Sequence, residues 1–260
     1  MAEISSLLKG LESCTIVDLS NDVGQHADGP FRTEMDVLEP EPGTRFFCEN
    51  VLPKLAPHTV GRFRPEDFPD GAFLRHEMVR ASTHAGSHID APGHYGPSRD
   101  SSDRFINDAE LGSFIAAGVS YDLTAVPGRE IHLEHLRIPD RVATARGNSQ
   151  RCIALLHTGG DKAIGADVIE AFLDVGVNVI GTDGASFDGP FAPMIENYLE
   201  TGDQSVLWPA HVLGRRRPYY QLERLNNLNA LPPDGFLVFA LPVRIEGATA
   251  AWTRAIALVP

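Results

Sequence analysis

The apolar residues of this chain fall mostly in short runs, and these runs predict more strands than helices. An apolar run of about four to eight residues between polar or glycine-rich flanks is typical of a buried strand. Runs of this kind, some of them partly alternating, occur at residues 15–20, 73–83, 118–124, 152–159, 235–245 and 251–259. We expect the last two to form a hairpin around the turn GATA.

Helical periodicity is confined to a few segments. Helices are predicted at residues 3–13, 104–117 and 132–136, and residues 166–184 indicate a helix, a tight turn, a strand and a loop. Helices and strands alternate only in part, and no long linker divides the chain. The expected fold class is therefore α/β, as one domain over residues 1–260 with a mixed β-sheet core and flanking helices.

Residues 21–72 interrupt this pattern. Proline, glycine and aspartate recur there in HADGPF, EPEPGT and PEDFPDG. These residue types favour turns. We therefore expect loops broken by short strands in this part of the chain.

The composition excludes several classes of partner. The 260 residues include 35 acidic and 22 basic side chains, for a formal net charge of −13. This balance argues against a nucleic acid or a membrane surface as the partner and is compatible with binding a cation. We find no apolar run of the roughly 18 residues that a membrane span needs, no signal peptide and no cysteine framework. We expect a cytoplasmic protein that acts on a small molecule.

The most informative stretch is STHAGSHIDAPGHY, residues 82–95, which places three histidines and an aspartate within eleven residues. Its glycines and proline disfavour a helix, so we expect a folded-back loop. On an extended stretch, His88 and Asp90 would point the same way because they are two residues apart.

Imidazole nitrogen and carboxylate oxygen are ligands that zinc, manganese and iron accept. A catalytic metal site keeps one position open for water, whose pKa can fall to about 7. A histidine-rich loop without a metal is the simpler interpretation, but such a cluster rarely arises by chance. On residue chemistry alone, the cluster favours a hydrolytic metal site.

This stretch also resembles a known signature. HAGSHIDAPGH, residues 84–94, is similar to the pattern H-x-G-T-H-x-D-x-P-x-H of the cyclase family of metal-dependent hydrolases. That family includes bacterial kynurenine formamidases, isatin hydrolases and proteins named as polyketide cyclases. Ser87 stands where threonine is usual. Further similarity at IVDLS, LLHTG, IGTDGASFD and the closing strands extends the resemblance over nearly the whole chain, with residues 21–75 as a loop-rich insertion.

The resemblance implies a second cluster, a histidine followed twelve residues later by a glutamate. His211 and Glu223 have this separation in AHVLGRRRPYYQLERLNNLNALP. Without the family pattern, Glu223 could equally be a solvated helix residue. The run Arg215–Arg217 replaces the usual apolar residues, and such a run is usually solvated.

Roles for these residues follow from the resemblance. His84, His88 and Asp90 would hold one divalent metal, Zn²⁺ or Mn²⁺. Asp90 and Glu223 would help to form a second metal position with His211. A site with one ion and a subset of these ligands also occurs in relatives.

His94 is implied as the catalytic proton shuttle rather than a ligand. Hydrolysis requires a proton at the leaving group, and imidazole can supply one near neutral pH. A role as a further ligand, or as support for one, is the alternative.

Other candidates carry weaker signals. Phe73, Ser186 and Trp208 could contact the substrate, although aromatic side chains equally pack in cores. The loop that contains Asp183, Ser186 and Asp188 is either a tight turn or a wall or brace of the site.

Three functions are compatible with these features. The favoured one is metal-dependent hydrolysis of an amide, formamide, lactam or lactone in a small aromatic or cyclic substrate. The alternative is a metal-dependent cyclase or dehydratase of polyketide biosynthesis. A non-catalytic metal-binding protein is the third, and the spare imidazole of His94 argues against it. By resemblance we expect a homodimer or homotetramer.

Overall fold

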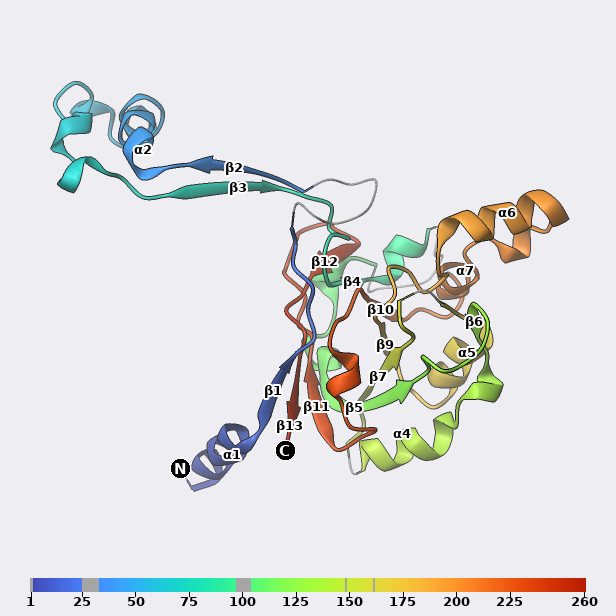
Figure 1. The fold of residues 1–260 in the computed structure, drawn as a ribbon. Coiled ribbons are helices and arrows are strands. Elements are labelled where there is room, and N and C mark those ends of the chain that lie inside the picture. Colours follow the sequence, from blue (N-terminus) through green and yellow to red (C-terminus); the bar gives the residue numbers. More distant parts are fainter. Residues whose placement is uncertain (1, 25–32, 97–103, 148, 161) are drawn as a thin grey trace. The chain divides into compact units, whose positions relative to one another are not determined.

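The computed structural model describes residues 2–24, 33–96, 104–147, 149–160 and 162–260 (Figure 1). The chain divides into two compact units. The main unit comprises Met1–Asp22 with Thr83–Pro260, and the ribbon unit comprises Val23–Ser82. The ribbon unit overlaps the predicted insertion at residues 21–75. The assignment of the whole chain to one catalytic domain stays a prediction.

A mixed sheet forms the centre of the main unit, as predicted from the sequence. Its strand order is β1-β13-β11-β5-β7-β9-β10-β4-β12. Strands β5, β7, β9 and β10 run parallel to one another, and the remaining neighbours pair antiparallel. The strands are β1 (Thr15–Asp18), β4 (His88–Asp90), β5 (Ile115–Asp122), β7 (Cys152–His157), β9 (Val179–Thr182), β10 (Tyr220–Glu223), β11 (Phe236–Phe239), β12 (Ala250–Trp252) and β13 (Ile256–Val259).

Buried apolar side chains form a core on each face of this sheet. One core includes Val142, Phe172 and Leu213, which come from three helices on the same side of the sheet (Figure 1). The opposite core includes Ile89 and Leu222 from the sheet itself. The helices of the main unit are α1 (Ala2–Ser13), α4 (Ile138–Arg146), α5 (Ala166–Asp174), α6 (Phe191–Thr201) and α7 (Pro209–Gly214).

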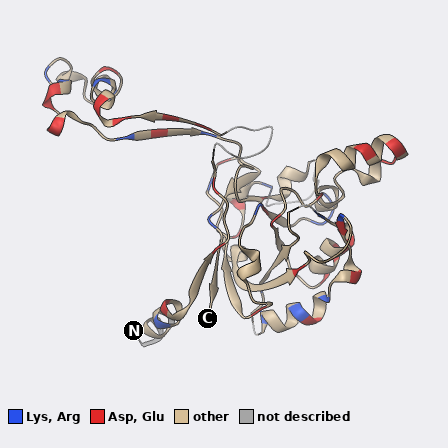
Figure 2. Cartoon of the chain, viewed as in Figure 1, with Lys and Arg blue, Asp and Glu red and all other residues tan. Residues whose placement is uncertain are grey.

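Smaller elements complete the main unit. Strands β6 (Glu130–Ile131) and β8 (Ala163–Ile164) form a short parallel pair. The 3-10 helices are Pro92–Tyr95, Ile106–Asp108, Leu111–Phe114, Leu133–His135, Gln204–Val206 and Leu228–Ala230. In Figure 2, α4 carries both acidic and basic residues, whereas the charged residues of α6 are all acidic.

The ribbon unit has its own architecture. β2 (Glu34–Leu38) and β3 (His76–Arg80) form an antiparallel ribbon. The rings of Phe47, Phe63, Phe68 and Phe73 pack together at centroid distances of 4.9 to 5.6 Å. Between the strands lie α2 (Pro40–Phe46), a π-helix (Phe47–Val51), α3 (Leu52–Leu55) and 3-10 helices at Pro57–Thr59, Pro65–Asp67 and Pro69–Gly71.

The expectation of loops broken by short strands in residues 21–72 is largely wrong, because helical turns occupy much of this segment. Proline misled the interpretation. It stands in the first turn of these helices, where its fixed φ suits the helix and its missing N–H is not needed.

The predicted helix at residues 104–117 is also wrong. Two 3-10 helices lead directly into β5, which lies between β11 and β7. Pairing on both sides buries most of this strand, and tertiary packing of this kind overrides a weak helical pattern.

The predicted hairpin around GATA is confirmed. Leu237 pairs with Leu258, and an isolated bridge between Pro242 and Thr253 continues the same register. The second arm is split, because β12 also pairs with β4. Among the described residues, none of the helices is both long enough and apolar enough to cross a membrane.

Candidate metal centre

Strand β4 presents His88 and Asp90 on one face of the sheet. The strand lies between β10 and β12, so residues 82–95 are not a folded-back loop throughout. Side chains alternate along a strand, and Ile89 packs in the core of the opposite face. His88 and Asp90 therefore share the other face, as their spacing predicts. They are 1% and 0% exposed, respectively.

The turn before β4 determines which nitrogen of His88 is available. Gly86 has a φ of +60°, a left-handed conformation that glycine adopts without strain. Its carbonyl oxygen lies 2.9 Å from Nδ1 of His88 and accepts a hydrogen bond from it. Because Nδ1 carries the hydrogen, Nε2 of the neutral ring keeps a lone pair, which a metal ligand requires.

The hydroxyl of Ser87 ties this turn to two other segments. It accepts a hydrogen bond from the backbone N–H of Asn21 at 2.7 Å and donates one to the carbonyl of Arg224 at 2.5 Å. Ser87 is 1% exposed. A threonine hydroxyl could make the same two bonds, so the departure from the usual signature preserves the chemistry of this position.

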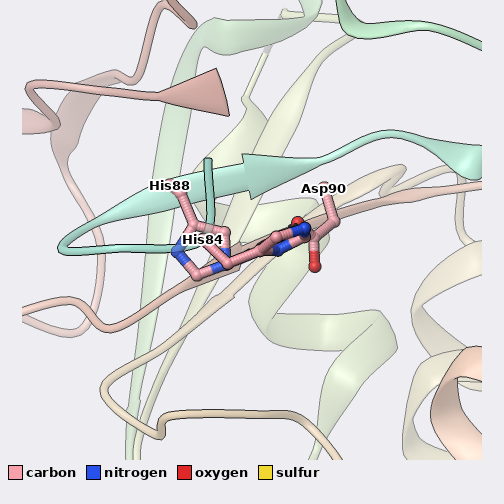
Figure 3. Close-up of side chains that lie close together, drawn as sticks. All are labelled: His84, His88 and Asp90. Carbon is pink, nitrogen blue, oxygen red and sulfur yellow. Dashed lines mark ion pairs between the residues drawn. The ribbon is translucent and has the colours of Figure 1, made fainter. Parts of the chain in front are cut away.

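Three of the predicted ligands converge in space (Figure 3). Oδ1 of Asp90 lies 3.0 Å from Nδ1 of His84 and 3.6 Å from Nε2 of His88. One ligand atom from each residue lies within 4.8 Å of those of the other two. Two imidazoles and a carboxylate are therefore within reach of a single ion.

Glu223 reaches this group from the neighbouring strand. β10 pairs with β4 so that Glu223 stands opposite His88, with Oε2 3.4 Å from Nε2 of His88. Its other oxygen, Oε1, accepts a hydrogen bond from the N–H of Phe187 at 3.1 Å. The interpretation of Glu223 as a solvated helix residue is wrong, because the residue is buried in a strand.

His94 and His211 form a second group with Asp90. Nε2 of His94, in the 3-10 helix after β4, lies 3.7 Å from Oδ2 of Asp90. The ring centroid of His211, on α7, lies 5.4 Å from that of His94. These three residues form a second set whose ligand atoms lie within 4.8 Å of one another. The two sets share Asp90, and this geometry suits His94 either as a proton carrier or as a ligand.

Asp188 lies behind His211. Its Oδ2 is 2.5 Å from Nδ1 of His211, and its Oδ1 accepts a hydrogen bond from the N–H of Ala210 at 2.7 Å. Burial lowers the pKa of His211, but Asp188, with Glu223 and Asp90, outweighs burial and raises that pKa above its ordinary value. From sequence, the loop of Asp188 was either a turn or a brace, and no local spacing linked it to His211.

Burial and neighbouring charges together shift the pKa values of Asp90, His88 and His94. Burial raises the pKa of Asp90, but His88, His84 and His94 together outweigh burial and bring the value to about 2. Burial lowers the pKa of His88, but Asp90 and Glu223 raise it to about 8. Burial, opposed by Asp90 and helped by neighbouring imidazoles, lowers the pKa of His94 to about 4. His94 is therefore neutral at neutral pH.

The buried polar atoms of the group fit a divalent metal. Within the part of the chain that the structure describes, Nε2 of His88 and both carboxylate oxygens of Asp90 are buried without a hydrogen bond. Such atoms are rare in native proteins, and each costs about 1–3 kcal/mol. Convergent nitrogen and oxygen donors are the ligands of zinc and manganese. An ion bound here would satisfy these atoms.

The weaker candidates have other contacts. Oγ of the buried Ser186 accepts a hydrogen bond from the N–H of Asp188 at 3.3 Å, so it braces the loop. Trp208 precedes α7 with a left-handed φ of +49°, and its ring contacts Phe191. Phe73 packs within the phenylalanine cluster of the ribbon unit. Substrate contact by Phe73, Ser186 or Trp208 stays a prediction.

The arginine run after α7 is not simply a solvated stretch. Nε of Arg215 donates to the carbonyl of Tyr95 at 2.5 Å, and Arg217 pairs with Asp174 at 2.8 Å. Tyr95 follows His94 directly. Arg215 therefore connects the end of α7 to the turn that carries His94.

Comparison with known proteins gives the relationships of the chain. Residues 17–189 match the family described as "Putative cyclase". A kynurenine formamidase of Sphingopyxis alaskensis is 33% identical over 181 residues, which cover 66% of this chain and 75% of the relative. An isatin hydrolase of Roseibium aggregatum is 26% identical over 235 residues, which cover 82% of this chain and 84% of the relative.

The fold also matches that of solved structures. Isatin hydrolase A from Labrenzia aggregata, solved with bound benzyl benzoate, superposes with a TM-score of 0.72 over 99% of both chains at 19% identity.

The two relatives named above, an isatin hydrolase and a kynurenine formamidase, are hydrolases, which favours hydrolysis over the cyclisation considered from the sequence. The family match extends over most of the chain and includes the whole HAGSHIDAPGH signature, and on this basis the chain belongs to the cyclase family.

Proposed function

We propose that this chain is a metal-dependent hydrolase that cleaves the C–N bond of an amide, formamide or lactam, or the ester bond of a lactone. The substrate is small and aromatic or cyclic. The observation that carries the proposal is the group of half-buried His84 with buried His88 and Asp90. Their ligand atoms lie within 4.8 Å of one another, and His88 Nε2 and both carboxylate oxygens of Asp90 lack hydrogen bonds among the described residues. The isatin hydrolase and kynurenine formamidase relatives support a C–N bond as the target.

The ligand set determines where an ion would lie. His84, His88 and Asp90 would hold one ion, and Asp90 with His211 and Glu223 would contribute to a second. When bound, a divalent metal polarises a carbonyl group and lowers the pKa of water to about 7.

His94 moves the proton in this proposal. Its low pKa leaves Nε2 able to accept a proton from water as the water oxygen adds to the carbonyl carbon. The same nitrogen then donates that proton to the leaving nitrogen or oxygen as the C–N or C–O bond breaks. Asp90, whose Oδ2 lies 3.7 Å from Nε2 of His94, stabilises the imidazolium formed between the two transfers.

The experiment that tests this function uses protein loaded with zinc or manganese, with isatin and formylkynurenine as the first substrates. Reaction in oxygen-18 water should place one labelled oxygen in the carboxylate product. A ring-closed product without label would overturn hydrolysis in favour of cyclisation.

The identity and number of metal ions form a separate part of the proposal. Nitrogen and oxygen ligands suit both Zn²⁺ and Mn²⁺, and the two ligand sets that share Asp90 support either one or two ions. Elemental analysis of the purified protein, expressed as ions per chain, distinguishes these cases.

We also propose a cytoplasmic homodimer or homotetramer that acts on a small molecule and has no nucleic-acid or membrane partner. The net charge of −13 argues against a nucleic acid or a membrane surface as a partner. Met35, Val37, Met78 and Val79 of the β2–β3 ribbon are exposed, and a two-stranded ribbon is marginally stable alone, which supports contact with another copy. Light scattering of the purified protein measures the assembly.

A further inference from the structure

We infer that Asp188 is a positioning residue, which holds His211 with hydrogen on Nδ1 and so leaves Nε2 as the nitrogen that can bind a metal. The inference rests on the proposed function, since it assigns a purpose to the orientation of a proposed ligand. Neither the family signature nor the local sequence pattern pairs these two residues.

The carboxylate of Asp188 is committed entirely to the start of α7. Oδ2 lies 2.5 Å from Nδ1 of His211, and Oδ1 accepts the N–H of Ala210 at 2.7 Å. The side chain of Asp188 is 0% exposed and that of His211 is 14% exposed. A carboxylate can only accept hydrogen bonds, so the hydrogen of the imidazole lies on Nδ1.

The backbone beside His211 is anchored as well. The carbonyl of Ala210 accepts a hydrogen bond from the hydroxyl of Tyr219 at 3.1 Å. Tyr219 is itself fixed, because its ring stacks on Tyr95 at 5.4 Å and Nε2 of Gln221 donates to its hydroxyl at 2.5 Å. Ala210 is thus held through both its N–H and its C=O. The freedom that remains to His211 is rotation of its own side chain, and Asp188 removes it.

The consequence lies on the opposite side of the ring. With Nδ1 occupied, Nε2 is the nitrogen that His211 can contribute to the set it forms with Asp90 and His94. His88 shows the same arrangement, but there the acceptor is the carbonyl of Gly86, which no side-chain replacement removes. Carboxylates that orient metal-binding histidines in this way typically account for about 10- to 100-fold in metal affinity.

Asp188→Asn is the sharpest test, because it preserves the shape of the side chain. The amide oxygen can still accept the N–H of Ala210, which turns the amide NH₂ toward His211. Nδ1 then becomes the acceptor and the hydrogen moves to Nε2, which can no longer bind a metal. We expect the Kd for Zn²⁺ at the position to which His211 contributes, measured by competition with a chromogenic chelator, to rise about 10- to 100-fold.

Asp183→Asn is the matched control. Asp183 lies in the same loop, but its carboxylate accepts the backbone N–H groups of Thr158 and Gly159 at 2.8 and 2.9 Å, and no contact joins it to His211 among the described residues. Loss of these bonds can lower stability in the same loop. Its Kd for Zn²⁺ should stay at the wild-type value.

A second readout requires neither metal nor turnover. Nitrogen-15 NMR of histidine-labelled, metal-free, full-length protein, recorded at increasing pH until the imidazole shifts no longer change, reports the tautomer of each neutral ring. The signals of His211 are those lost in His211→Gln. We expect hydrogen on Nδ1 in the wild type and in Asp183→Asn, and on Nε2 in Asp188→Asn.

The outcomes separate the two hypotheses. If Asp188→Asn keeps both the Nδ1–H tautomer and the wild-type Kd for Zn²⁺, the positioning role is wrong. If the wild type binds Zn²⁺ but hydrolyses none of the substrates, the proposed function is wrong. The role of Asp188 is then decided by the tautomer of His211 alone. If Asp188→Asn does not fold, Asp188→Glu is used instead, since its longer side chain displaces the carboxylate from Nδ1 of His211. An unchanged metal affinity in Asp188→Glu would then overturn the inference.

Discussion

Glu223 stands opposite His88 in the antiparallel pairing of β10 with β4, and its Oε2 lies 3.4 Å from Nε2 of His88. This pairing brings the downstream cluster to the HAGSHIDAPGH signature. It also gives His88 two carboxylate neighbours, Asp90 and Glu223, and all three residues are buried. A buried imidazole between two carboxylates is arranged to bind a cation.

Replacement of His88 should remove metal and activity together. His88→Ala deletes a buried ligand of the first set, so metal content after dialysis and turnover should both fall to background. His58→Ala, which removes an exposed histidine of the ribbon unit, is the matched control and should retain both. Full metal content in His88→Ala would contradict the ligand role.

Replacement of His94 should separate chemistry from binding. His94→Ala removes the proposed proton carrier, so kcat should fall by about 10²- to 10⁴-fold while metal content per chain stays unchanged. Elemental analysis and turnover measured on the same sample decide the point. If the variant loses metal, His94 is a ligand of the second set and another group carries the proton.

Metal affinity should rise with pH and level off near pH 8. In the metal-free protein Asp90 and Glu223 raise the pKa of His88 to about 8, above its ordinary 6.5, so a proton occupies the ring below that pH. A metal has to displace this proton, and each pH unit below 8 should therefore weaken binding about tenfold. Zinc titrations between about pH 6 and pH 9 measure the slope.

The raised pKa of His88 also makes the stability of the metal-free protein depend on pH. A folded-state pKa above the unfolded value stabilises the metal-free protein below about pH 6.5, and this contribution is lost as pH rises through about 8.

Glu223→Gln removes one of the two carboxylates beside His88, so the pH at which metal affinity levels off should move to a lower value. An unchanged value would show that Glu223 does not act on His88.

The hydroxyl at position 87 should matter more than the identity of the residue. Ser87→Ala removes the acceptor of the Asn21 N–H and the donor to the Arg224 carbonyl, at a site that is 1% exposed. We expect it to lower the free energy of unfolding by about 1–3 kcal/mol. Ser87→Thr keeps the hydroxyl and should lie close to the wild type. Urea unfolding of the three proteins, without metal, measures both differences, and equal loss in the two variants would contradict this role.

Much of the main unit could be predicted from local patterns. Apolar runs located the strands around residues 15–20, 118–124 and 152–159, because burial in a sheet demands contiguous apolar residues. Residues 104–117 show the limit of this approach. Two 3-10 helices take the place of the predicted helix, and the last three residues belong to β5, where pairing with two neighbours outweighs intrinsic propensity.

The site divides in the same way. The sequence by itself determined that His88 and Asp90 share a face, because side chains two apart on an extended segment point the same way. It also supplied the ligand types, since imidazole and carboxylate are properties of the residues. Only the tertiary structure decided that Glu223 faces His88 and that Asp188 holds His211. Strand pairing and helix packing create these contacts between residues far apart in the chain, and no local spacing encodes a distance that depends on the whole sheet.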